Sequence, residues 1–98
     1  MLIEVKDKFT EDLLPEQGFA IVKFGAIWCA PCKMLEKSLK EWENDLPNIY
    51  SVNVDNDDES VSKYNISSVP VLLIFKDRKK INEHAGLIGK EDLVKLIS

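Results

Sequence analysis

The sequence has 98 residues, of which 45% are hydrophobic and 31% charged, and its net charge is −4 at neutral pH. This length predicts one domain, residues 1–98, that buries about two-thirds of its unfolded surface without metal or extra cross-links. The acidic balance argues against nucleic-acid binding, which needs a basic face, and no apolar run approaches the ~20 residues of a membrane span.

The first half of the chain alternates strands and helices, as the spacing of its apolar residues indicates. Residues 2–5 predict a short strand, residues 9–14 a short helix, and the apolar run 19–25 a buried strand. A long helix is expected over 30–45, because apolar residues recur there at three-to-four spacing, at Leu35, Leu39, Trp42 and Leu46. Charges on its outer face are expected to pair in solvent, Glu36 with Lys40 and Lys37 with Glu41.

The second half of the chain continues the alternation and closes with a hairpin and a helix. A continuous apolar run at 71–75 indicates a strand buried on both faces. The other predicted elements are a strand at 49–54, a turn at 55–58, a helix at 59–64, a polar turn at 77–80, a strand at 81–85 and a helix at 90–97. The acidic run 55–59 is interpreted as a solvated turn. The order β-α-β-α-β-α-β-β-α places the chain in the α/β class, with a mixed sheet whose parallel strands are followed by an antiparallel hairpin.

The two cysteines, Cys29 and Cys32, lie where the buried strand gives way to the long helix. Cys29 fits the N-cap position and Cys32 lies one turn inside the helix, a spacing that allows a disulfide. Pro31 then falls in the first helical turn, where its missing N–H costs little. The positive end of the helix dipole stabilises a thiolate, so the pKa of Cys29 is expected to fall.

The Cys29–Cys32 pair is interpreted as a redox couple, since a bridge over two intervening residues closes too little chain to add much stability. The first residues lack the basic and apolar segments of a signal peptide, so we expect a cytoplasmic protein. The cytoplasm is reducing, and in that compartment two cysteines separated by two residues indicate redox catalysis. A zinc site is not expected, because it needs about four ligands and the chain offers two cysteines and one histidine. Inert buried thiols, or an iron–sulfur cluster shared by two chains, are the alternatives.

The motif Trp28-Cys29-Ala30-Pro31-Cys32-Lys33-Met34 is followed by Val69-Pro70 before an apolar strand and by Gly86 after the last strand. These residues, together with the order of elements over the whole chain, resemble the thioredoxin family. The resemblance implies the thioredoxin fold, a central mixed β-sheet with helices on both faces. It also implies a general thiol–disulfide oxidoreductase that reduces protein disulfides, binds no cofactor and is a monomer.

The resemblance also implies roles for individual residues. Cys29 would be the attacking thiolate and Cys32 the resolving thiol, which leaves a Cys29–Cys32 disulfide that thioredoxin reductase would reduce. Ribonucleotide reductase, peroxiredoxin and methionine sulfoxide reductase would be the substrates. Pro70 is expected to be cis beside the cysteines, and the Val69 backbone to pair with substrate. The implied docking surface consists of Trp28, Ala30, Pro31, Val69, Pro70, Ala85 and Gly86.

Three residues depart from the family pattern: Ala30 replaces the usual Gly, Lys23 replaces a buried Asp, and Ser51 replaces the Lys that partners this Asp. Burial disfavours a charged Lys, which leaves two catalytic roles for Lys23. A charged Lys23 would favour thiolates and make the protein a weaker reductant, whereas a neutral Lys23 could accept the proton of Cys32. The alternative without a catalytic role buries the Lys23 stem and leaves its amine in water.

Two other functions remain alternatives. A more oxidising disulfide oxidant or isomerase is favoured by Lys23 and disfavoured by the absence of a signal peptide. A non-catalytic binding module on the same fold is disfavoured by the retention of both Cys29 and Cys32.

Overall fold

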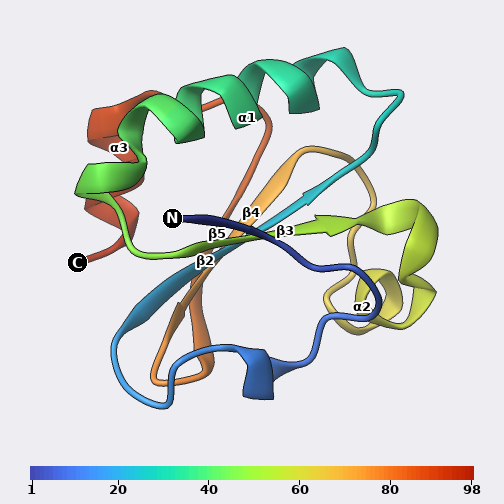
Figure 1. Ribbon diagram of the computed structural model, residues 1–98, viewed down its shortest axis with the longest axis horizontal. Helices are drawn as coiled ribbons and strands as arrows, with labels where there is room; N and C mark the ends of the chain where they lie inside the picture. Colours follow the sequence, from blue (N-terminus) through green and yellow to red (C-terminus); the bar gives the residue numbers. More distant parts are fainter.

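The computed structural model describes residues 1–98 and contains a five-stranded sheet in the order β1-β3-β2-β4-β5 (Figure 1). Strands β1, β3 and β2 run parallel, whereas β4 is antiparallel to β2 and β5 is antiparallel to β4. The strands are β1 Leu2–Glu4, β2 Phe19–Gly25, β3 Ile49–Asn53, β4 Val71–Lys76 and β5 Lys79–Ala85. The sheet is therefore mixed, as the order of elements predicts.

Helices cover both faces of this sheet, with α1 and α3 on one face and α2 on the other (Figure 1). The helices are α1 Ala30–Trp42, α2 Asp58–Lys63 and α3 Lys90–Leu96, and the 3-10 turns are η1 Glu11–Leu13, η2 Glu43–Asp45 and η3 Val54–Asn56. No helix in the structure has the length and apolar character needed to cross a membrane.

Each face of the sheet has its own apolar core. Leu35 and Leu39 of α1 and Leu93 of α3 are almost fully buried in one core, and Phe24 and Phe75 contribute to the other. Strand β2 supplies side chains to both cores, because successive residues of a strand point to opposite faces. The chain that leaves β2 toward the cysteines therefore starts from the most tightly packed part of the sheet.

The larger differences from the sequence-based expectation concern the end of α1, the helix expected near 9–14 and the hairpin turn, whereas the other boundaries shift by at most one residue. Helix α1 ends at Trp42 and a separate 3-10 turn follows, and the helix expected near 9–14 is only the turn η1. The hairpin turn is shorter than expected, because Asp77 and Arg78 have positive φ angles of 52° and 67° and β5 begins at Lys79. Two central residues with positive φ give a tight turn that matches the twist of the flanking strands.

Candidate active site

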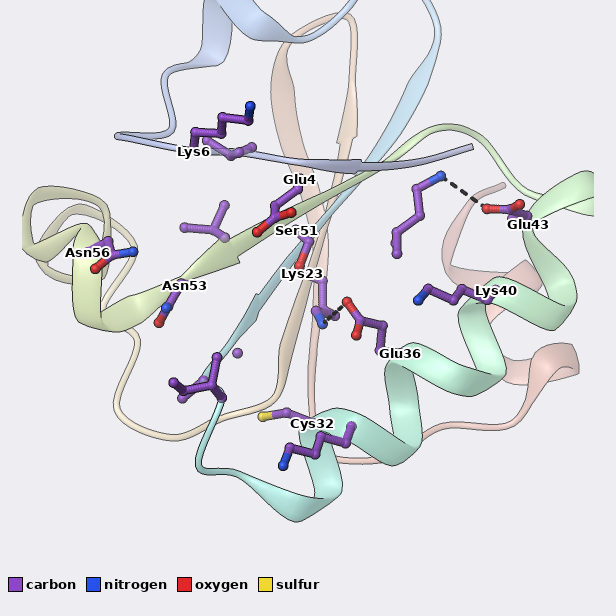
Figure 2. Close-up of a pocket in the computed structure, with 17 residues that line it drawn as sticks. Glu4, Lys6, Lys23, Cys32, Glu36, Lys40, Glu43, Ser51, Asn53 and Asn56 are labelled. Atoms are coloured by element: carbon purple, nitrogen blue, oxygen red, sulfur yellow. Dashed lines mark hydrogen bonds and ion pairs between the residues drawn. The ribbon is translucent and has the colours of Figure 1, made fainter.

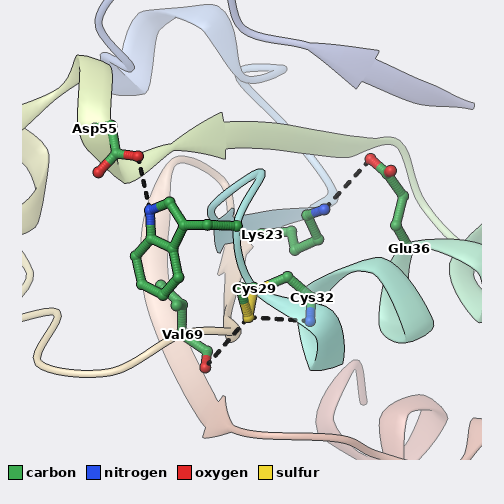
Figure 3. Close-up of a disulfide and its surroundings, with 7 residues drawn as sticks. Lys23, Cys29, Cys32, Glu36, Asp55 and Val69 are labelled. Carbon is green, nitrogen blue, oxygen red and sulfur yellow. Dashed lines mark hydrogen bonds and ion pairs between the residues drawn. A yellow bond between two sulfur atoms is a disulfide. The ribbon is translucent and has the colours of Figure 1, made fainter.

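The cysteines lie at the junction of β2 and α1, where the sequence predicts them (Figure 3). Cys29 is the N-cap of α1, and its Sγ accepts a hydrogen bond from the Cys32 N–H at 3.2 Å. The two residues form a disulfide with their Cα atoms 5.3 Å apart, and Pro31 lies in the first helical turn. After reduction, Cys29 Sγ therefore lies where a backbone N–H and the helix dipole favour a thiolate.

The loop before β4 approaches the disulfide from the other side. The Val69–Pro70 peptide bond is cis, as expected, and the Val69 carbonyl oxygen lies 3.9 Å from Cys29 Sγ (Figure 3). Gly86 has a φ of +92° and donates its N–H to the Pro70 carbonyl oxygen at 2.8 Å. Ala85 pairs with the first residue of β4. The segment after β5 is thus tied to the loop that contacts Cys29 Sγ.

Exposed apolar side chains flank the cysteines. Trp28 is 68% exposed, and its Nε1 donates a hydrogen bond to Asp55 Oδ2 at 2.9 Å, which ties the ring to η3 (Figure 3). Trp28 and Val69 line a hollow of about 380 Å³ beside the disulfide. Ala30 and Pro31 are exposed at the beginning of α1. An extended polypeptide could pack against this surface and present a disulfide to Cys29.

The structure brings the seven expected docking residues around the disulfide, but it does not expose them equally. Pro70 is buried, Val69 and Gly86 are half-buried, and Ala85 is exposed. Two further apolar residues near the cysteines, Ile27 and Met34, are 75% and 59% exposed and were not predicted from the sequence as part of this surface. The signal that could have found them is their apolar character next to a turn that must face substrate.

Lys23 lies inside the protein and its amine does not extend into water. Its side chain is 6% exposed, and its Nζ lies 3.3 Å from Glu36 Oε1 (Figures 2 and 3). The alternative that left the amine in solvent is therefore wrong. The surface pair expected between Glu36 and Lys40 does not form, because Glu36 turns toward the sheet and pairs with Lys23. The expected Lys37–Glu41 pair is also not formed.

Gly25 leaves a small space between Lys23 and Cys32. A methyl group on its Cα would lie 3.4 Å from Cys32 Sγ and 3.6 Å from Lys23 Cε, so both side chains border the volume of one methyl group. Ser51 is the β3 residue opposite Lys23 and carries no charge. These residues and Glu36 line an open cavity of about 1200 Å³ between α1 and the β1 edge of the sheet (Figure 2).

A family model described as thioredoxin matches residues 1–98. The chain belongs to the thioredoxin family. The thioredoxin of Chlamydia trachomatis is 40% identical over 83 residues, which covers 83% of this chain and 81% of that protein. The thioredoxin of Staphylococcus saprophyticus is 32% identical and covers 98% of this chain and 94% of its own length. The solved structure of reduced Schistosoma mansoni thioredoxin pre-protein is 31% identical, with a TM-score of 0.87, and the match covers 99% of this chain and 98% of that one.

These findings confirm the fold and the activity that the sequence predicts. The protein has the thioredoxin fold and is a thiol–disulfide oxidoreductase, a protein-disulfide reductase with Cys29 and Cys32 as its redox-active pair. Like other thioredoxins, it acts with disulfide-containing substrates and a reductase, and the family needs no added cofactor. The structure contains no group of three or more His, Cys, Asp and Glu side chains placed to hold a metal ion.

Proposed function

We propose that Cys29 is the attacking thiolate of this thioredoxin and Cys32 its resolving thiol. The observation that carries this assignment is the N-cap geometry: Cys29 Sγ accepts the Cys32 N–H, whereas Cys32 lies inside the first turn of α1. The burial of the two residues agrees with it, since Cys29 is 6% exposed and Cys32 2%. A sulfur that a substrate must reach first belongs at the better-exposed and better-stabilised position.

The proposed reaction has two exchange steps. The Cys29 thiolate forms a bond with one sulfur of the substrate disulfide, and the other substrate sulfur leaves with the bonding electrons and takes up a proton. The Cys32 thiolate then forms a bond with Cys29 Sγ, and the second substrate sulfur leaves in the same way. The substrate gains two electrons and two protons, and the protein is left with the Cys29–Cys32 disulfide.

The proposed docking surface consists of Trp28, Ala30, Pro31, Val69, Pro70, Ala85 and Gly86. The carbonyl oxygen of Val69 supports this proposal, because it lies 3.9 Å from Cys29 Sγ in the loop before β4, where it can accept a hydrogen bond from the backbone of an extended substrate. The Trp28 ring, fixed by Asp55, offers apolar area next to the sulfur. Lys23 is proposed to act on Cys32 from the opposite side of the disulfide.

We assign the protein to the cytoplasm as a one-domain monomer that carries electrons from thioredoxin reductase. Its proposed substrates are ribonucleotide reductase, peroxiredoxin and methionine sulfoxide reductase. The family match over residues 1–98 and the single sheet support the domain assignment. The curated relatives from Chlamydia and Staphylococcus support the general chemistry but name no substrate.

Single-cysteine variants test the assignment of the two sulfurs. We expect Cys32→Ser to accumulate a mixed disulfide with a disulfide-containing protein, because Cys29 still attacks and nothing resolves the product. Cys29→Ser should give no mixed disulfide under the same conditions. The measurement is mass spectrometry after acid quenching, with the oxidised parent protein as control. A mixed disulfide that accumulates in Cys29→Ser and not in Cys32→Ser would reverse the assignment.

The reduction potential separates a general reductant from the oxidant or isomerase that a charged Lys23 favours. Equilibration of the Cys29–Cys32 couple with a thiol of known potential measures it directly. A potential near about −270 mV agrees with a general reductant, whereas a potential above about −200 mV places the protein with the oxidants and isomerases.

A further inference from the structure

Lys23 and Glu36 form an ion pair that borders the resolving cysteine. We propose that Glu36 keeps Lys23 charged inside the protein, and that this fixed ammonium favours the thiolate of Cys32 when it resolves the mixed disulfide. The inference rests on the proposed function, because it assumes that Cys32 is the resolving thiol. Lys23 acts on the reacting sulfur, and Glu36 is a positioning residue that acts through Lys23.

The placement of the three side chains supports this proposal. Cys32 and Glu36 are four residues apart on α1, so they share one face of the helix, one turn apart. Lys23 reaches this face from β2: its Cε borders the same small space above Gly25 as Cys32 Sγ, and its Nζ contacts Glu36 at 3.3 Å. Figure 2 shows Lys23 and Glu36 pointing toward each other from β2 and α1, with Cys32 at the start of the same helix.

Burial makes the pairing necessary. An ammonium that is removed from water is disfavoured unless a carboxylate or several hydrogen bonds compensate it. Lys23 is 5% exposed, and Glu36 is the only acidic side chain within ion-pair distance of its amine. The strand neighbours of Lys23, Ser51 on β3 and Leu72 on β4, offer no countercharge. Removal of the Glu36 charge should therefore leave the buried Lys23 amine without a countercharge.

The open cavity gives the proton of Cys32 a route to water. Cys32 and Lys23 both line it, and the Glu36 side chain is 37% exposed at its wall. In the resolving step the Cys32 S–H bond breaks and its proton goes to water in this cavity, so Lys23 keeps its own protons. The thiolate then bonds to Cys29 Sγ, and the substrate sulfur leaves with the electrons of the broken bond and takes a proton from water. Other charged side chains on the cavity wall are Glu4, Lys6, Lys33, Lys40 and Glu43.

A symmetric aromatic disulfide separates the two steps, because each step releases one coloured thiolate. The first release reports attack by Cys29 and the second reports resolution by Cys32. We expect Glu36→Gln to slow the second release about tenfold at pH 7. The midpoint of the pH profile of this release should rise by about one pH unit, because a shift of about one unit corresponds to a tenfold change in the thiolate fraction. The first release should change less than about twofold, since Cys29 is stabilised by the helix N-terminus instead.

Three further variants make the result specific. Glu36→Asp should restore part of the rate, because it keeps the carboxylate on a shorter side chain. Lys23→Met should slow the second release as much as Glu36→Gln, and the double variant should be no slower than either one, because both remove the same ammonium. Glu41→Gln removes one negative charge from the exposed part of α1, away from the cavity, and should behave as the parent.

The outcomes distinguish this inference from the proposed function. An unchanged or faster second release in Glu36→Gln would overturn the role of Glu36, and an unchanged second release in Lys23→Met would overturn that of Lys23. Absence of the first release in the parent protein would instead refute the assignment of Cys29. Far-ultraviolet circular dichroism and thermal unfolding of each variant establish that the kinetic differences come from folded protein.

Discussion

Gly86 and Gly18 form a matched pair with which the positioning of the Pro70 loop can be tested. Their φ angles are +92° and +94°, and a methyl group at either Cα would meet no atom within 4 Å. Substitution by Ala therefore introduces backbone strain at both positions without a steric clash. Only Gly86 is hydrogen-bonded to the active site, since its N–H donates to the Pro70 carbonyl oxygen at 2.8 Å. Gly18 directly precedes β2, at the end of this strand that lies away from the cysteines.

The expected loss of stability follows from the backbone conformation. A residue other than Gly at such a φ costs about 1–3 kcal/mol, and Ala regains about 0.4–1 kcal/mol by restricting the unfolded chain. Gly86→Ala and Gly18→Ala should thus each lower the free energy of unfolding by about 1–2 kcal/mol. For a domain of this size, the melting temperature should fall by about 4–15 °C.

The two variants should differ in catalysis. In Gly86→Ala, the backbone strain can be relieved by movement of the N–H of residue 86 away from Pro70. This movement would shift the loop whose Val69 carbonyl oxygen lies 3.9 Å from Cys29 Sγ. We expect Gly86→Ala to slow mixed-disulfide formation with a protein disulfide about three- to tenfold, and Gly18→Ala to leave it within about twofold. Stopped-flow measurements at a temperature where both variants are fully folded provide the comparison. Equal rates in the two variants would refute the link between Gly86 and the docking surface.

Two further predictions concern the buried Asp57 and the hydrogen bond between Trp28 and Asp55. Burial raises the pKa of Asp57, but hydrogen bonds from the Phe9 and Ser60 N–H groups outweigh it and hold this pKa below its ordinary value. Asp57 therefore stabilises the fold above the ordinary pKa of about 4, and the contribution is lost as the pH falls through its lower folded value. Asp57→Asn should lower the free energy of unfolding by about 1–3 kcal/mol at pH 7. In urea titrations at acid pH, this free energy should fall less steeply with decreasing pH in the variant than in the parent, and an equally steep fall would contradict this account. Trp28→Phe removes the hydrogen bond to Asp55 and should slow attack on a protein disulfide about two- to fivefold. Attack on a small aromatic disulfide should change less. Equal effects on both substrates would show that the Trp28–Asp55 contact does not serve docking.

Local patterns in the sequence predict most of the fold because they depend on neighbouring residues. The apolar run at 19–25, the helical spacing after Cys32 and the run at 71–75 each report burial of one face or of both. The ends of elements are less predictable, since the turn at Asp77 and Arg78 depends on two positive φ angles for which the sequence has no Gly or Asn signal. The end of α1 at Trp42 likewise has no breaker next to it.

Long-range polar contacts are the part that the sequence could not supply. Asp57 was expected in a solvated turn but is 1% exposed, because it caps α2 and also binds the Phe9 N–H, 48 residues away. An Asp directly before a helix is an N-cap signal, but the helix was predicted to begin at residue 59 and not at Asp58, and nothing local identifies Phe9 as the partner of Asp57. Glu36 was expected to pair in solvent with Lys40, and its position one turn after Cys32 was the available clue to its inward direction.

The same contacts explain how a charge next to the disulfide can change sign while the fold is kept. The resemblance to thioredoxins implies a carboxylate on β2 and a lysine on β3, whereas this chain has Lys23 on β2, Ser51 on β3 and the carboxylate of Glu36 on α1. The exchange keeps one positive and one negative side chain in contact, so burial of the pair remains compensated. It also moves the carboxylate onto α1, one helical turn after Cys32, and brings the lysine stem to the small space above Gly25 that Cys32 Sγ borders. The role proposed for Lys23 follows from this exchange, since a positive side chain near Cys32 would stabilise its thiolate and with it the reduced dithiol.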